Sequence, residues 1–130
     1  MKYVILIHSN PTPWGHPTQL HTDEGRALPP EKHAEMDREF DALMAEISAS
    51  GEFVTAEALA DPASATLFGW SPEGNLVTEG PYAESKEHLA GFFLIDVASR
   101  ERAEEIAATF AQPGGVVELR PAMWPDGNDQ

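Results

Sequence analysis

Side chains suited to proton transfer and to ligand binding lie close together in a short run before an apolar segment. The run, TEGPYAESKEHLAG, spans residues 78–91. Glu84 and Glu87 suit a general acid and a general base, because opposed environments separate the pKa values of two carboxyl groups. Lys86 suits an anionic ligand, and Tyr82 supplies an aromatic ring beside it. The same run also suits a structural role, in which the Gly-Pro pair builds a turn and the charges meet a partner subunit.

Two further polar side chains lie on predicted strands. His8 ends the first strand and projects to the same side as Val4 and Leu6, which is where we expect a cavity. It is therefore a candidate catalytic group, with a satisfied histidine at the edge of the core as the alternative. Arg120 shares the last strand with Glu118, and a lone cation there suits a carboxylate, from either a ligand or the protein itself.

A metal site is the weaker hypothesis for the histidines. His8, His16 and His21 lie in the first part of the chain, and Asp23 or His33 would complete a ligand set. The spacing lacks the close pairs that metal sites use, and the chain has no cysteine. No glycine-rich phosphate loop is present either. We expect neither a metal nor a cofactor.

The elements that must position these residues follow from hydrophobic periodicity. A connector at residues 10–30, rich in proline and glycine, is expected to have no regular structure. Strands are predicted at 2–8, 52–59, 89–97 and 116–120, helices at 31–49 and 100–111, and a hairpin at 65–70 and 75–79. With the hairpin set aside, the order is βαββαβ, which predicts an α+β fold of the ferredoxin-like, split βαβ type. We expect a single domain at residues 1–123, followed by a polar tail at 124–130.

The predicted strands at 2–8 and 89–97 are apolar on both faces. The two helices would cover one face of the sheet. When the other face of an antiparallel sheet is exposed to water, its strands alternate apolar and polar residues. A second copy of the chain would cover the other face. The sequence therefore predicts a homodimer packed sheet to sheet, with a cavity at or near the interface.

Composition narrows the possible partners. The chain has 130 residues, 42% of them hydrophobic, and a formal net charge of −14. That charge repels phosphate backbones, so we expect no nucleic acid. No apolar run is long enough to span a membrane, and the apolar start lacks a cleavage site, so we expect a cytoplasmic location.

The run at residues 78–91 resembles the DGPF motif of the YCII-related (DGPF-domain) family. Residues that match the motif are Gly80, Pro81, Ala83, Glu84, Lys86, Glu87, Leu89 and Gly91, whereas Glu79 and Tyr82 replace Asp and Phe. The resemblance implies a dimeric α+β barrel. Some relatives carry a catalytic His/Asp pair, but here Phe40 stands where their histidine would fall, so that pair does not carry over.

Two functions remain open. The first is binding or transformation of a small organic molecule in a cavity at the dimer interface, by His/carboxylate proton transfer. The second is a non-catalytic accessory or regulatory role through protein–protein contacts, of the kind the family shows beside sigma factors. The first predicts a mainly apolar pocket with a functional His or Glu, and the second predicts an exposed apolar patch. The sequence does not decide whether the protein is an enzyme.

Overall fold

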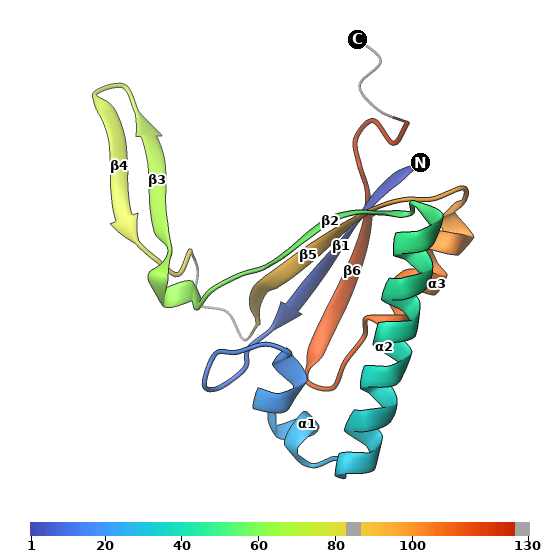
Figure 1. Cartoon of the computed structure of the whole chain (residues 1–130). Helices are drawn as coiled ribbons and strands as arrows, with labels where there is room; N and C mark the ends of the chain where they lie inside the picture. Colours follow the sequence, from blue (N-terminus) through green and yellow to red (C-terminus); the bar gives the residue numbers. More distant parts are fainter. Residues whose placement is uncertain (83–86, 127–130) are drawn as a thin grey trace.

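The computed structural model describes residues 1–82 and 87–126 and has the expected α+β fold (Figure 1). Its main sheet is antiparallel, with the strand order β2-β5-β1-β6. The strands are β1 (Lys2–Ser9), β2 (Phe53–Ala58), β5 (His88–Asp96) and β6 (Gly115–Pro121). Helices α2 (Pro30–Ser50) and α3 (Arg100–Thr109) lie on the same side of this sheet. This arrangement is compatible with the ferredoxin-like fold.

The ends of both helices follow from local chemistry. Pro30 starts α2, where its missing N–H would have had no partner in any case. Gly51 ends α2 with a φ of 84°, a left-handed conformation that glycine adopts without strain. Ser99 caps α3, and its Oγ accepts a hydrogen bond of 3.1 Å from the backbone N–H of Arg102.

The core lies between the sheet and the two helices. Tyr3 and Ile5 of β1 are buried there, together with Ile47 of α2 and Ile106 of α3. One face of α2 packs against this core with Phe40, Leu43, Met44 and Ile47. Val117 and Leu119 of β6 also pack against the core, which confirms the predicted alternation of that strand.

The other face of the sheet carries apolar side chains that nothing within residues 1–82 and 87–126 fully covers. In the β1–β5 register Val4 pairs with Leu94, and Leu6 pairs with Phe92. All four are only partly buried, unlike Tyr3 on the helix side. We call these four residues the open face.

The predicted hairpin forms a separate two-stranded sheet of β3 (Thr66–Ser71) and β4 (Gly74–Glu79), after a 3-10 turn η2 (Pro62–Ser64). It stands away from the main sheet, on the side opposite the helices (Figure 1). Phe68 is 68% exposed, Trp70 is 80% exposed and Val77 is also exposed. Because Phe68 pairs with Val77 and Trp70 lies two residues along β3, the three side chains share one face. We call them the hairpin face.

The expectation that the connector has no regular structure is wrong. It contains the 3-10 helix η1 (Thr18–His21) and the short helix α1 (Asp23–Arg26). Prolines break longer helices, but the stretch between Pro17 and Pro29 is free of proline and has room for single turns.

Hydrogen bonds fasten the connector to the rest of the fold. Thr22 is buried; its Oγ1 accepts from the backbone N–H of Gly25 at 3.1 Å and lies 3.1 Å from the carbonyl oxygen of Pro113, to which it donates. Nε2 of His33, on α2, donates to the carbonyl oxygen of Gly25 at 2.7 Å. Position 25 has room only for glycine, because a Cβ there would lie 1.6 Å from the backbone oxygen of Gln19.

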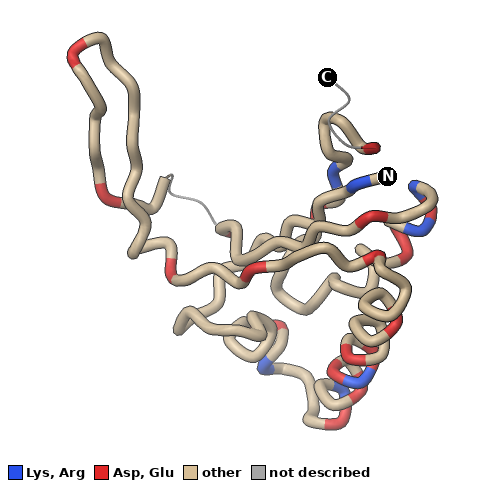
Figure 2. The backbone as a smooth tube through the Cα atoms, turned by 45° about the horizontal axis from the view of Figure 1, so that its top comes forward, with Lys and Arg blue, Asp and Glu red and all other residues tan. Residues whose placement is uncertain are grey.

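The acidic residues concentrate on the helices, as the red segments of Figure 2 show, whereas the connector carries few charges. Within residues 1–82 and 87–126, none of the helices is long and apolar enough to cross a membrane.

Candidate functional site

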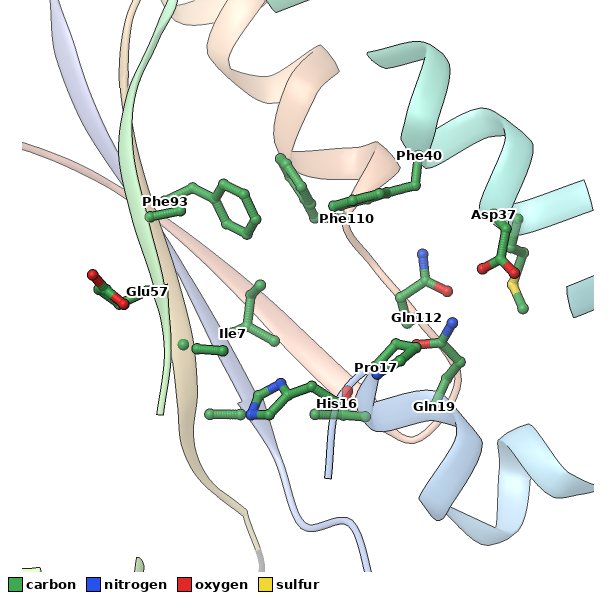
Figure 3. A pocket seen from close by; sticks show the side chains of 16 residues that line it. Ile7, His16, Pro17, Gln19, Asp37, Phe40, Glu57, Phe93, Phe110 and Gln112 are labelled. Carbon is green, nitrogen blue, oxygen red and sulfur yellow. The ribbon is translucent and has the colours of Figure 1, made fainter. Parts of the chain in front are cut away.

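A pocket of about 510 Å³ opens on the helix side of the sheet (Figure 3). Its walls come from the ends of β1, β2 and β5, from the first half of α2, from the segment after α3 and from the connector. The residues that line it are Ile7, His16, Pro17, Thr18, Gln19, Met36, Asp37, Phe40, Ala56, Glu57, Ala58, Ala90, Gly91, Phe93, Phe110 and Gln112. The volume is in the range of sites for small organic molecules.

Three phenylalanine rings form one side of the pocket, and we call them the aromatic wall. The ring centroids of Phe93 and Phe110 are 4.3 Å apart, and those of Phe40 and Phe110 are 5.5 Å apart. Each ring is also part of the core or packs against it, so the wall is held in place from behind. A flat apolar ligand would find preformed contacts there.

Small residues leave the space in front of this wall. Ala56 and Ala58 of β2 and Ala90 and Gly91 of β5 line the pocket where larger side chains would fill it. A Cβ at Gly91 would lie 2.8 Å from the backbone oxygen of Glu57, so close strand packing requires glycine there.

Two glutamine amides supply polar groups at the inner end of the pocket. Gln19 is only 5% exposed, and no hydrogen bond of its amide occurs among the described residues. Oε1 of Gln112 is buried, and within the described part of the chain no donor reaches it. Figure 3 shows both side chains projecting into the region below the aromatic wall.

The ionisable residues of the pocket do not form a His/carboxylate pair. Nε2 of His16 donates to the carbonyl oxygen of Leu59 at 3.0 Å, and Asp37 lies on the far side of the pocket (Figure 3). Glu57 contributes its backbone, since its carboxylate projects to the other side of β2. Neither lysine nor arginine occurs among the described lining residues.

The open side of the sheet brings together two of the candidate residues. Nε2 of His8 donates to Oε1 of Glu118 at 3.0 Å, and Arg120 donates to the other oxygen of the same carboxylate. The hydrogen bond from His8, followed by that from Arg120, holds the pKa of Glu118 below its usual range. The three side chains therefore satisfy one another, and they lie on the opposite side of the sheet from the pocket of Figure 3.

The remaining candidates lie at the edge of the sheet or outside the described residues. Tyr82 is 88% exposed. Glu87 is partly buried directly before β5 and lines two further hollows, one beside the connector and one beside Tyr82. Glu84 and Lys86 fall outside the residues that the structure describes.

The sequence argument did not find Gln19, Gln112 or the aromatic wall. Phe93 and Phe110 appear in the sequence as ordinary core residues, and nothing in their spacing marks a pocket. The available signal was the length of the connector, because long connectors in small domains usually serve a function.

The family model for the YCII-related domain matches residues 1–123. The chain belongs to the YCII-related family. It is also similar to an uncharacterized protein of Rhizobium meliloti (strain 1021), with 33% identity over 87 residues, which cover 65% of this chain and 70% of that protein. The resemblance drawn from the run at residues 78–91 is thus confirmed, and the family match spans the connector as well.

Proposed function

We propose that this YCII-related protein binds a small, largely apolar organic molecule in the pocket of Figure 3. The observation that carries the proposal is a preformed cavity with an aromatic wall and with a buried oxygen, Oε1 of Gln112, that no donor of the described residues reaches. The site lies within one chain, on the helix side of the sheet, rather than at the interface where the sequence argument placed a cavity.

His16 is the group in this pocket best suited to exchange a proton with a ligand. The hydrogen bond to the carbonyl oxygen of Leu59 requires the proton on Nε2, so neutral His16 keeps Nδ1 as an acceptor. Trp14 steadies the ring, since its Nε1 donates to the same carbonyl at 2.9 Å and the two rings meet edge to face. Any proton-transfer chemistry of this protein is assigned to His16 in this proposal.

Binding of naphthalene, a ring system without polar groups, tests the proposal. We expect saturable binding of one molecule per chain, with NMR shifts at the aromatic wall. Ala56→Leu would fill the pocket and abolish binding, because Ala56 lines it. Thr55→Leu, the matched control on the opposite face of the same strand, should bind normally. Naphthalene binding that Ala56→Leu leaves intact would refute the proposal.

A homodimer is the second part of the proposal. The open face presents Val4, Leu6, Phe92 and Leu94, which a second sheet would cover. The salt-bridged Glu118 beside it would meet the partner with its charge already neutralised. An isologous pair of this kind closes on itself and leaves the helix-side pockets on its outside.

The accessory role is supported by a different observation, the hairpin face. Isolated two-stranded hairpins are marginally stable in water, and this one exposes Phe68, Trp70 and Val77 together. Exposed apolar surfaces of this kind mark protein contacts. Under this alternative, Trp70→Ser abolishes the biological role without changing naphthalene binding. Under the pocket proposal, Ala56→Leu abolishes both naphthalene binding and the biological role.

A further inference from the structure

The polar groups deepest in the pocket are neutral amides. The side chain of Gln19 is almost fully enclosed, and its backbone is held by the turn that Thr22 and Gly25 stabilise. The amide of Gln112 has a weak contact of 3.5 Å from Nε2 to the carbonyl oxygen of Thr109, and its Oε1 has no donor among the described residues. Buried polar atoms are nearly always paired, so the buried Oε1 of Gln112, which no described donor reaches, points to a ligand that pairs with it, and the amide of Gln19 lines the same pocket.

A side-chain amide forms its best hydrogen bonds with a particular kind of group. It offers a carbonyl that accepts and an NH₂ group that donates, and a terminal amide turns easily about its last torsion. A ligand group with both a donor and an acceptor would satisfy the two halves together. The buried Oε1 of Gln112 in particular needs a donor, because leaving a buried acceptor unpaired is costly.

The charges around the pocket disfavour an anion. No lysine or arginine is found among the lining residues of the described chain, and the Nε2–H of His16 is already donated to the carbonyl oxygen of Leu59, so a carboxylate or phosphate would find no permanent cation to pair with. Asp37 is the lining side chain with a charge that faces this space, and its sign is negative. The net charge of −14 adds to the repulsion.

A cation is not favoured at the inner end either. Asp37 is exposed and could hold one at the rim, but Gln19 and Gln112 carry no charge to replace the water that a buried ammonium group would lose. The aromatic wall meanwhile favours a ring compound for the rest of the ligand, because its tilted and edge-on rings offer the contacts that aromatic rings prefer with one another.

We infer that the ligand of this pocket is a flat, uncharged ring compound whose amide-like group pairs with Gln112 and Gln19 while its ring lies against Phe40, Phe93 and Phe110. This inference rests on the proposed function, since it specifies the chemical class that the same pocket takes.

Four probes of one shape test the class: naphthalene, 2-naphthamide, 2-naphthoate and 2-naphthylmethylamine, titrated by calorimetry into the full chain. We expect 2-naphthamide to bind about tenfold more tightly than naphthalene, as one or two net hydrogen bonds provide. The affinity for 2-naphthoate should be lower than that for 2-naphthamide by a factor of at least about ten. Tighter binding of either charged probe than of the naphthamide would overturn the inference.

Gln112→Leu tests the assigned residue. The variant should lose most of the preference for 2-naphthamide over naphthalene, whatever its own affinity for naphthalene. Gln112→Glu keeps the shape and the acceptors and adds a negative charge, so it should widen the gap between the naphthamide and the naphthoate. An unchanged preference in Gln112→Leu would overturn the assignment. If naphthalene itself did not bind, the proposed function would be wrong. If naphthalene bound but the affinities of the four probes followed another order, only the inferred ligand class would be wrong.

Discussion

At the scale of single residues, Arg102 organises the polar contacts between the two helices and the sheet. Its Nε and Nη2 donate to the two oxygens of Glu52 at 2.9 Å each, and Nη2 also donates to Glu46. Both Arg102 and Glu52 are largely shielded from water. The bidentate geometry makes the ion pair of Arg102 and Glu52 stronger than an ordinary surface ion pair. The hydrogen bond from Arg102 is the main reason why the pKa of Glu52 lies below its usual value.

Removing this carboxylate should destabilise the fold in a pH-dependent way. A carboxyl group with a lowered pKa in the folded state contributes stability above its unfolded value of 4.5, and that contribution is lost as the pH falls through the folded pKa. Glu52→Gln should therefore lower the free energy of unfolding by about 1–3 kcal/mol at neutral pH. The difference from the parent protein should shrink below pH 4.5.

Urea unfolding across the pH range measures this difference. Glu46→Gln is the matched control, because Glu46 contacts the same guanidinium but is mostly exposed. Its effect should be smaller, as expected for an exposed pair. A Glu52→Gln effect that did not change between neutral and acid pH would contradict the assignment.

At the scale of elements, the connector is the part of the fold that builds the pocket. It carries His16 and Gln19, and Thr22 ties it both to its own short helix and to the turn before β6. A Cβ at Gly114 in that turn would lie 2.5 Å from Oγ1 of Thr22, which shows how closely the two segments pack.

Loss of the Thr22 hydroxyl should loosen this tie. Thr22→Val keeps the shape but removes the cap, which costs about 1–2 kcal/mol in comparable helices. Naphthalene should then bind several-fold more weakly, because Gln19 is no longer held at the end of the pocket. Thr22→Ser retains the hydroxyl and should bind nearly as well as the parent. Equal naphthalene affinity in the parent and in Thr22→Val would show that the tie does not shape the pocket.

At the scale of the whole molecule, the open face predicts a dimer in solution. Leu94→Lys places a charge at its centre and should give a monomer by light scattering at micromolar concentration. Ala108→Lys, on the exposed side of α3, should leave the dimer intact. Two chains that each carry −14 repel one another, so the parent dimer should tighten as salt is added. A parent protein that is monomeric at this concentration would contradict the prediction.

The sequence alone was enough for the strands, for the two long helices and for their order, but not for the short helices of the connector. The apolar run at residues 2–8, the alternation at residues 116–120 and the helical stripe through Phe40 and Ile47 are local signals, and the structure has a strand or a helix at each of them. The motif at residues 78–91 was likewise enough for the family, which the family model confirms. Local patterns and motifs can be recognised in the sequence because the residues that form them are neighbours in the chain.

The pocket depended on tertiary structure. Gln19, Phe40, Phe93 and Gln112 are far apart in the chain, and they meet because the connector folds back against the open end of the helix–sheet layer. His8 and Glu118 are 110 residues apart and become neighbours through the register of β1 and β6. Contacts of this kind depend on strand register and on how a loop is fastened. Neither leaves a periodic signal in the sequence, so only the folded chain shows which polar groups remain without a partner.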